Sequence, residues 1–398
     1  MRKKVFVHLE SGRGYSRDIL RGIYAYNNRV SHWDIIFEPA YFLKTRQAKN
    51  NLSIIKAVKP DGCIVEFGDN IAEMSRLGIP IIQVTSVNHF PDIPYVKGNY
   101  DTDGELAAAY FRKKGFRNLA FFGIEKLEWS VARLASFEKR AGQWGAAFYS
   151  YLLKGNERDV LSHNFGELIS WLKGLPRPTG ILCCNDDFGQ ILINACSMAG
   201  IKVPHEIAVL GIDNDELICN ITYPNLSSIS RNHYQTANTI CTMLSDLMNG
   251  KQPGEKVILT EAAEVIERAS TDTVAVEDEE VTRAISYITA NLSKQLGVAE
   301  VAAQGALSIK ALNNRFKVAT GHSIHEEIQL RRLSRFKQLL LDNKSIKEIA
   351  FALGFPDDSH ISRWFSNLEG QSPIQWKKKF AEHFQPGSQT SVHRSHRD

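Results

Sequence analysis

The chain has 398 residues, of which 43% are hydrophobic and 23% charged, a composition typical of a globular protein with about two or three domains. No window approaches the roughly 18 consecutive apolar residues that a membrane-spanning helix needs. The N-terminal sequence MRKKVFVHLESG becomes polar too soon for a signal peptide. We therefore expect a cytoplasmic protein that does not span a membrane.

The first part of the chain alternates apolar, strand-like runs with amphipathic helical stretches. Strands are predicted at 4–9, 33–37, 61–67 and 78–84, and helices at 15–26 and 46–58. This alternation with short loops is typical of a parallel sheet covered by helices on both faces. Neither GxGxxG nor GxxxxGKS/T occurs in the sequence, which argues against a nucleotide-dependent enzyme.

A second round of the same alternation follows. The expected helices are 104–114, 138–153 and 188–200, and the expected strands are 118–124, 180–186 and 208–215. Two consecutive α/β halves predict two lobes with a cleft between them. In open parallel sheets, ligands bind at the carboxyl ends of the strands.

The cysteines are scattered through these predicted elements, and none has a CxxC or other zinc-like spacing. We expect them to be reduced and packed as small apolar side chains, and we expect no metal ion or cofactor. The six are Cys63, Cys183, Cys184, Cys196, Cys219 and Cys241.

Residues 345–376 have the pattern of two amphipathic helices joined by a tight turn at Gly354, where glycine allows a positive φ. This is the plan of a helix-turn-helix, whose second helix enters the major groove of DNA. Residues 281–398 carry 17 Lys and Arg against 10 Asp and Glu, a net charge of +7, whereas the rest of the chain has a net charge of −3. A basic segment of this kind fits a domain that neutralises phosphates.

The pattern I-x-x-I-A-x-x-x-G-F, followed by S-x-x-x-x-x-F and G-x-S-P, resembles the second half of an AraC-type DNA-binding domain. Upstream, LSIKALNNRFKVATGHS at 307–323 resembles the first half. The resemblance covers about 281–383 and implies an all-α domain of seven helices with two helix-turn-helix units. The sequence departs from the family at Ala306, where glycine is expected, and an alanine in a left-handed turn would cost on the order of 1 kcal/mol.

The block NDDFGQILINACSMAGIKVPHEIAVLGIDNDE at 185–216 resembles LacI/GalR-type sensor domains, which have the two-lobed α/β fold of periplasmic binding proteins. VIERASTD at 265–272 resembles the last strand and tail of that fold. A LacI-like sensor followed by an AraC-type domain is the arrangement of the XylR-like regulators. The resemblance implies a sensor over 1–272 and a DNA-binding domain over 281–383. We expect the acidic segment 273–280 to be a linker and 384–398 to be a disordered tail.

A sugar-binding site needs carboxylates, amides, arginines and an aromatic face. The LacI-type resemblance implies Asp213, Asn185 and Arg140, the last as the arginine of an R-x-x-x-F/W motif that ends at Trp144. The alternatives are a helix N-cap for Asp213, a turn position for Asn185 and a surface position for Arg140. Candidates by position alone are Glu10, Glu66, Tyr15 and Trp129.

Candidate base-contacting residues lie on the exposed face of the second helix of each helix-turn-helix unit. They are Lys310, Asn313 and Asn314 in the first unit, and Asp358, Ser359, His360, Ser362 and Arg363 in the second. Arg363 and Asn314 are the best candidates for direct readout, because arginine pairs with guanine and asparagine with adenine. The alternative for each is a phosphate contact or simple exposure to solvent, and Asp358 has the further alternative of capping its helix.

Together these features predict a sugar-responsive transcription regulator that is not an enzyme. The resemblance implies a pentose effector, D-xylose first, activation of catabolic genes, and a homodimer that is paired through its sensor domains and binds repeated operator half-sites. RNA polymerase is a candidate partner. The alternative is the same architecture with another effector, such as a hexose or a purine, acting as a repressor. An enzyme with acid–base carboxylates in a sugar cleft conflicts with the sensor-like loops and the tethered DNA-binding domain.

Overall fold

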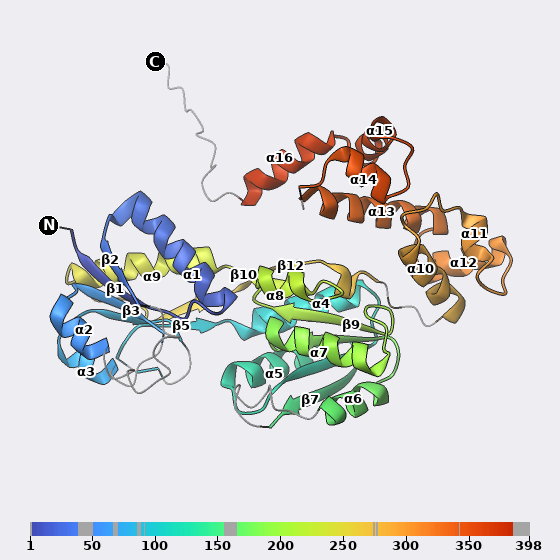
Figure 1. Cartoon of the computed structure of the whole chain (residues 1–398). Helices are drawn as coiled ribbons and strands as arrows, with labels where there is room; N and C mark the ends of the chain where they lie inside the picture. Colours follow the sequence, from blue (N-terminus) through green and yellow to red (C-terminus); the bar gives the residue numbers. More distant parts are fainter. Residues whose placement is uncertain are drawn as a thin grey trace, which may run out of the picture. The chain divides into compact units, whose positions relative to one another are not determined.

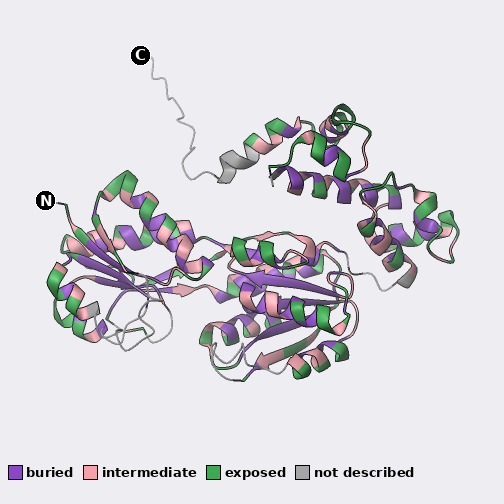
Figure 2. Ribbon diagram, viewed as in Figure 1, coloured by how far each residue is buried: buried purple, intermediate pink, exposed green. Residues whose placement is uncertain are grey.

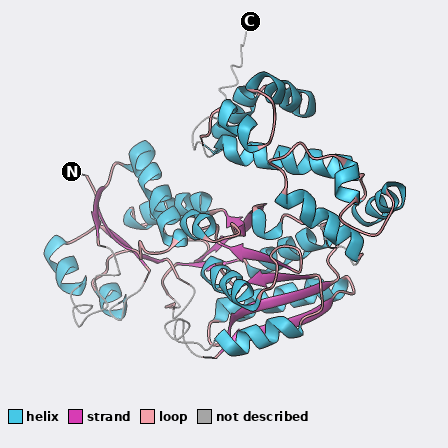
Figure 3. Ribbon diagram, turned by 45° about the vertical axis from the view of Figure 1, so that its right-hand side comes forward, coloured by secondary structure: helices cyan, strands magenta, loops and turns pink. Residues whose placement is uncertain are grey.

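The computed structural model describes residues 2–38, 51–66, 71–85, 89–90, 92–154, 165–273, 275, 278–341 and 343–384. The chain divides into two compact units, Met1–Ala275 and Val276–Asp398 (Figure 1). The first unit is the expected two-lobed α/β fold, and the second is all-helical (Figure 3). The predicted tail 384–398 lies outside the described residues except for Phe384, the last residue of a helix.

The first lobe contains a six-stranded sheet in the order β11-β5-β4-β3-β1-β2, with every neighbouring pair parallel. Its strands are β1 (Lys4–His8), β2 (Asp34–Phe37), β3 (Gly62–Val65), β4 (Ile81–Gln83), β5 (Tyr95–Gly98) and β11 (Val257–Thr260). Helices α1 (Gly14–Tyr26) and α9 (His233–Met248) pack together on one core cluster. They approach closely at Gly22, where an added Cβ would lie 2.4 Å from the Cβ of Ala237. Helices α2 (Asn51–Val58) and α3 (Ile71–Arg76) belong to a second cluster.

The second lobe contains a six-stranded sheet in the order β12-β10-β9-β8-β6-β7. Only the pair β10–β12 is antiparallel among its described strands. The strands are β6 (Asn118–Ile124), β7 (Ala147–Leu153), β8 (Thr179–Cys183), β9 (Ile207–Ile212), β10 (Ser227–Arg231) and β12 (Ala262–Ile266), and the helices are α4 (Tyr100–Lys113), α5 (Glu128–Gln143), α6 (Phe165–Gly174), α7 (Asp186–Ala199) and α8 (Glu216–Ile221). The strands β8 and β9 are buried throughout, as parallel strands covered on both faces must be (Figure 2).

The chain passes between the two sheets at three places: between β5 and α4, between β10 and α9, and between β11 and β12. These crossings lie side by side, because Asn99 N–H donates to Thr260 O at 2.8 Å and Asn232 N–H donates to Glu261 O at 3.0 Å. The two lobes therefore share a common hinge region made of three chain segments.

One predicted helix is wrong in its second half. We expected a helix over 138–153, but α5 ends at Gln143 and Ala147–Leu153 form strand β7, which pairs in parallel with β6. Gly145, with a φ of +70°, lies in the turn between them. The run AFYSYLL is rich in aromatic residues, which are enriched in strands, and it pairs with β6 along its whole length.

The second unit contains seven helices over its described residues, α10 (Glu279–Ala290), α11 (Val298–Ala302), α12 (Ile309–Thr320), α13 (Ile324–Leu341), α14 (Ile346–Ala352), α15 (Asp358–Glu369) and α16 (Pro373–Phe384). The pairs α11–α12 and α14–α15 form two helix-turn-helix units, and α13 connects them. The second helix-turn-helix unit packs on one core, which includes buried Phe336, Ile349, Ile361 and Phe365.

The predicted linker 273–280 is structured at both of its ends. Thr273 is buried, and Ala275 N–H donates to Lys114 O at 2.8 Å, so this part packs on the first unit. At the other end, Asp278 caps α10, which begins at Glu279. The three positions 274, 276 and 277 lie outside the described residues.

Candidate functional site

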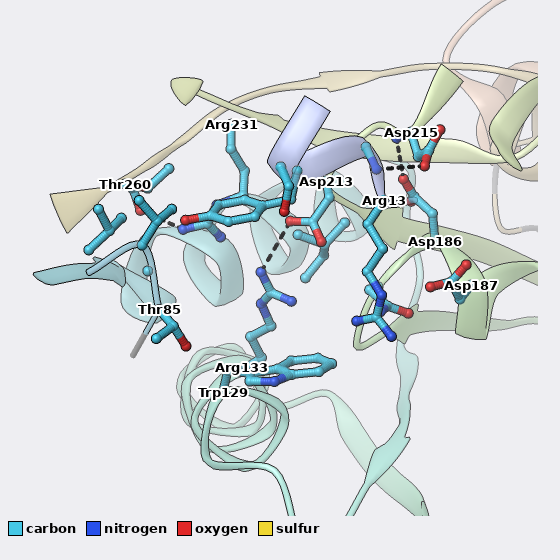
Figure 4. A pocket seen from close by; sticks show the side chains of 18 of the residues that line it. Arg13, Thr85, Trp129, Arg133, Asp186, Asp187, Asp213, Asp215, Arg231 and Thr260 are labelled. Carbon is cyan, nitrogen blue, oxygen red and sulfur yellow. Dashed lines mark hydrogen bonds and ion pairs between the residues drawn. The ribbon is translucent and has the colours of Figure 1, made fainter. Parts of the chain in front are cut away.

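A cavity of about 290 Å³ lies between the two lobes of the first unit (Figure 4). Its lining comes from the carboxyl ends of strands in both sheets and from the start of α1, as expected for an open α/β sheet. Glu66 follows β3, Asn185 follows β8 and Asp213 follows β9. The polar and aromatic lining residues are Arg13, Tyr15, Ser16, Glu66, Thr85, Tyr100, Trp129, Arg133, Asn185, Asp186, Asp187, Asp213, Asp215, Arg231 and Thr260.

Arg133, on α5, is the central cation of this cavity. Its Nε donates to Asp103 Oδ2 at 2.9 Å, its Nη1 donates to Cys184 O at 2.6 Å, and its Nη2 lies 3.4 Å from Asp213 Oδ1. The guanidinium also lies 5.3 Å from the ring centroid of Trp129, a cation–π distance. Burial alone would lower the Arg133 pKa, but the carboxylates of Asp103 and Asp213 raise it by more, so the group stays charged.

Arg231, at the end of β10, shares the Asp103 carboxylate with Arg133. It also donates to the carbonyl of Thr260, the last residue of β11 (Figure 4). Asp103 is fully buried, and its two arginine partners compensate the charge that would otherwise be costly there. Arg133 and Arg231 are thus connected, through Asp103 and Thr260, to the segments that cross between the lobes.

Opposing faces of the cavity meet at Asp215, the N-cap of α8 in the second lobe. Its Oδ2 accepts from Gly14 N–H of the first lobe at 2.8 Å and pairs with Arg17 Nη2 at 2.8 Å. Asp186 lies behind it, accepting from Asp215 N–H and from Ser228 Oγ. Burial raises the pKa of Asp186 well above its usual range, and the hydrogen bonds from Ser228 and Asp215 oppose this shift.

Glu66 is a buried carboxyl on the first-lobe side of the cavity. Its Oε2 accepts from Glu10 N–H at 2.8 Å and from Ser16 Oγ at 2.9 Å. Burial raises its pKa to about 7, against the opposing effect of these two hydrogen bonds. The site therefore contains one carboxyl group that titrates near neutral pH.

Of the seven predicted ligand-binding residues, Asp213, Asn185, Glu66, Tyr15 and Trp129 line the cavity. The alternative of an N-cap is excluded for Asp213, because Asp215 caps α8. Asn185 does have a structural task, since its Oδ1 accepts from Phe188 N–H at 3.0 Å and caps α7.

The other two predicted residues lie outside the cavity lining. Arg140 lies outside the cavity lining and pairs with Glu105 at 3.2 Å on the surface. Glu10 is also outside the lining and contributes its backbone N–H to Glu66. The arginine that the sequence analysis missed is Arg133, which stands four residues before Phe137 and so satisfies the same R-x-x-x-F/W motif. Burial explains the difference: both Arg133 and Phe137 face inward on α5.

In the second unit, the two recognition helices α12 and α15 expose most of the predicted base-contacting residues. Lys310, Asn314, Asp358, Ser359, His360 and Arg363 are exposed, and Asn313 and Ser362 are partly buried. Asn313 has a structural role, because its Oδ1 accepts from Ile324 N–H at 3.1 Å. Asp357, and not Asp358, caps α15 and accepts from His360 N–H at 2.8 Å.

The turns of the two helix-turn-helix units differ. Gly354 has a φ of +68°, as expected for the second unit. In the first unit, neither Gly305 nor Ala306 has a positive φ, so the expected strain at Ala306 is absent. The turn instead runs against Glu280, whose Oε2 accepts from Ala306 N–H at 3.1 Å.

Within the described residues, no helix is long and apolar enough to cross a membrane, and no cluster of His, Cys, Asp and Glu suits a metal ion. All six cysteines are buried, and none of them forms a disulfide in the described part of the chain. Burial raises the pKa of Cys63 to about 12, which disfavours the reactive thiolate.

Comparisons with known proteins agree with this two-part organisation. A family model described as a periplasmic binding protein-like domain matches residues 108–271, and a helix-turn-helix domain model matches residues 301–379. A xylose operon regulatory protein of Haemophilus influenzae is 29% identical over 389 residues, covering 94% of this chain and 98% of the relative. One of Escherichia coli strain K12 is 26% identical over 389 residues, covering 94% and 97%.

Among solved structures, that of the xylose-binding transcription activator XylR aligns with a TM-score of 0.75 at 25% identity, covering 95% of this chain and 98% of the other. A LacI-type regulator from Alkaliphilus metalliredigens, complexed with D-xylulofuranose, aligns with a TM-score of 0.55 at 19% identity and covers 68% of this chain and 100% of its own. The second likeness concerns the fold of the sensor.

A two-lobed sensor fold with an interlobe cavity, followed by two helix-turn-helix units, defines a ligand-responsive transcription regulator. The match to XylR extends over nearly the whole chain and includes both units. The chain combines a periplasmic-binding-protein-like sensor domain with a helix-turn-helix domain of the AraC type, and it is similar to XylR over nearly its whole length.

Proposed function

We propose that the protein binds D-xylose in the interlobe cavity and, in response, activates transcription from an operator that its two helix-turn-helix units bind. The observation that carries the proposal is the polar cavity around Arg133 and Asp213 in a chain that also has two helix-turn-helix units. The similar proteins of Haemophilus influenzae and Escherichia coli are named as xylose operon regulators, which supports this choice of sugar.

The charges around the cavity favour a neutral, polyhydroxylated ligand. Arg133 and Arg231 are compensated by Asp103 and Asp213, and Asp215 is paired with Arg17. Asp186 accepts hydrogen bonds from Ser228 Oγ and Asp215 N–H, and burial raises its pKa. With charges already matched in this way, an anionic ligand would leave an unpaired charge in a partly dehydrated site, whereas hydroxyl groups can share these donors and acceptors.

The size and lining of the cavity also suit a small sugar. Its volume of about 290 Å³ is at the lower end for ligand sites. Trp129, Tyr100 and Tyr15 provide aromatic faces among the polar groups. A pentose uses such a mixed surface, with hydroxyl edges on the charged groups and C–H faces on the rings. A hexose or a purine remains the alternative effector, and repression the alternative mode of action.

We further propose a cytoplasmic homodimer that binds repeated half-sites, has operator DNA and RNA polymerase as partners, and uses no cofactor and no catalytic chemistry. The buried partners of the cavity carboxyl groups support a binding role. Asp186 is held by Ser228 and Asp215, and Glu66 by Glu10 and Ser16. Groups engaged in this way position a ligand and do not present a free acid–base pair.

A thermal-shift screen with D-xylose, L-arabinose, D-ribose, D-glucose and a purine base tests the effector, since a ligand that binds only the folded state raises Tm. We expect D-xylose to produce the largest rise. A fluorescence anisotropy assay on DNA selected from a randomised library should then show tighter binding with the sugar present. A larger rise with the hexose or the purine would favour the alternative effector, and weaker DNA binding with the sugar would favour a repressor that the sugar releases.

A further inference from the structure

We propose that helix α10 and the turn after it form a clamp that contacts both helix-turn-helix units. Glu280 positions the first of these units against the clamp, and Gly354 positions the second. The α10 clamp consists of Asp278 and Glu280, which contact the first helix-turn-helix unit, and of Ser293 and Lys294, which contact the second helix-turn-helix unit. The inference rests on the proposed DNA-binding function and adds the residues that fix how the two recognition helices are spaced.

At its N-terminal end, α10 contacts the turn and the recognition helix of the first helix-turn-helix unit. Glu280 Oε2 accepts from Ala306 N–H at 3.1 Å, and its Oε1 pairs with Arg283 at 2.7 Å. An added Cβ on Gly305 would lie 2.0 Å from Glu280 Oε2, so the carboxylate packs directly on the turn. Asp278 Oδ2 lies 3.4 Å from Nη1 of Arg315, which belongs to α12.

The turn that follows α10 contacts the second helix-turn-helix unit at Gly354. An added Cβ there would lie 2.4 Å from the carbonyl oxygen of Ser293 and 3.1 Å from the carbonyl carbon of Lys294. These are backbone atoms and cannot move aside as a flexible side chain would. Arg332, on α13, donates to the carbonyl of Lys294, and its guanidinium lies 5.5 Å from the ring centroid of Phe355, next to Gly354.

The recognition helices α12 and α15 are therefore connected twice: along the chain by α13, and through space by the α10 clamp. Two connections fix a distance and an orientation better than one helix with a turn at each end. We call the two DNA segments that the two recognition helices of one chain contact half-boxes. Only one spacing between the half-boxes should then be tolerated, because the two recognition helices enter the major groove at a fixed separation. In the sequence, α10 is also the first element after the sensor, so a displacement of its start acts on both units together.

The test compares two glycines of the full-length protein with the same backbone strain. Gly354 and Gly370 have φ values of +68° and +69°, but nothing lies within 4 Å of an added Cβ at Gly370. Gly354→Ala and Gly370→Ala thus share the left-handed cost of alanine, and only the first displaces Ser293. The probes are a duplex selected from a randomised library by the wild type, and the same duplex with one or two base pairs inserted between the half-boxes.

We expect Gly354→Ala to bind the original duplex on the order of tenfold more weakly and to lose most of its preference over the respaced duplexes. Gly370→Ala should keep the wild-type preference. Equal spacing preference in the two variants would overturn the clamp. If Gly354→Ala does not fold, Glu280→Ala replaces it, and a footprint with protection lost over one half-box supports the clamp, whereas an unchanged footprint overturns it.

A second readout keeps the clamp testable apart from DNA binding. If the wild type selects no duplex from the library, the DNA-binding proposal fails, and hydrogen exchange then decides the clamp. Backbone amides of residues 291–297 should exchange faster in Gly354→Ala than in Gly370→Ala. Glu280→Ala should likewise speed exchange in the turn 303–308, where Ala306 N–H loses its acceptor. Exchange rates that do not differ would contradict the clamp.

Discussion

The Nη2 atom of Arg133 lies 3.4 Å from the Oδ1 atom of Asp213 in the interlobe cavity. This distance is long for a charge-assisted hydrogen bond, whose usual length is about 2.7–2.9 Å. Arg133 is anchored more closely by Asp103, at 2.9 Å, and by the carbonyl of Cys184, at 2.6 Å. The pair therefore presents a fixed cation and a carboxylate that both retain capacity for a ligand hydroxyl.

We predict that Asp213→Asn weakens binding of D-xylose by about 10- to 150-fold, because a hydrogen bond to a charged group contributes about 1.5–3 kcal/mol. Asparagine keeps the shape of the side chain and tolerates the φ of +99° at this position. Isothermal calorimetry measures the change. The matched control is Arg140→Gln, which removes a charge from the same lobe outside the cavity and should leave the affinity unchanged. A wild-type affinity for Asp213→Asn would remove Asp213 from the site.

The contrast between Arg133 and Arg140 shows what the sequence could and could not predict about the site. Both arginines satisfy the R-x-x-x-F/W motif, and both lie on α5. Which of them faces the cavity depends on the rotation of that helix against β6 and α4, a tertiary property that the local pattern does not contain. The strand ends that carry Asp213, Asn185 and Glu66 were predictable, because apolar strands ending in polar residues mark one edge of a parallel sheet.

The same limit applies to the turn at Ala306 and to strand β7. We expected strain at Ala306 from the family pattern, but the long-range contact with Glu280 gives this turn another shape. Residues 138–153 were expected to form one helix, and pairing with β6 makes Ala147–Leu153 a strand. Periodicity and turn residues predict isolated elements well, whereas contacts between distant segments decide the ambiguous ones.

Glu66 should make the stability of the protein depend on pH. Burial raises its pKa to about 7 in the folded state, from 4.5. The hydrogen bonds from Glu10 N–H and Ser16 Oγ and the charge of Arg13 oppose this shift, and the charge of Glu10 adds to it. The folded state therefore binds more protons between these two values. Its contribution to stability is fully present below about pH 4.5 and is lost as the pH rises through about 7.

We predict that Glu66→Gln, which cannot ionise, gains stability relative to the wild type by on the order of 3 kcal/mol between pH 4 and pH 8. Urea unfolding of both proteins at several pH values measures the difference in the free energy of unfolding. Glu73→Gln, an exposed carboxylate on α3 of the same lobe, is the control and should show no such trend. A pH-independent difference for Glu66→Gln would mean that Glu66 ionises normally in the folded state.

Arg363 is exposed on α15 and can either contact a base or neutralise a phosphate. We predict that Arg363→Ala relaxes specificity at one base pair by about 1–3 kcal/mol, as expected for loss of a bidentate contact to guanine. The measurement is the affinity for the selected duplex and for its single-base-pair variants. Uniform weakening for every sequence, together with a smaller salt dependence, would identify a phosphate contact instead. Lys139→Ala, an exposed lysine of the sensor, controls for the change in net charge.

The proposed regulation requires the sugar to change DNA binding without touching the DNA. The sugar would stabilise one arrangement of the two lobes, since groups from both of them line the cavity. A ligand shifts such an equilibrium only by its differential affinity for the two states, typically about 1–3 kcal/mol. By reciprocity, operator DNA should change the affinity for D-xylose by the same factor, roughly 5- to 150-fold.

Insertion of a long Gly/Ser segment between Val276 and Glu277 should remove this coupling. Asp278 caps α10 and lies against Arg315, so a short connection can transmit a displacement to the recognition helices. A flexible segment has a variable end-to-end distance and therefore does not transmit that displacement. We expect the insertion variant to bind D-xylose and DNA as the wild type does, but with an affinity for each that the other no longer changes. Equal sugar affinities with and without operator in the parent protein would refute the coupling itself. Coupling that survives the insertion would show that the signal reaches the DNA-binding domain by direct contact with the sensor and not along the connecting chain.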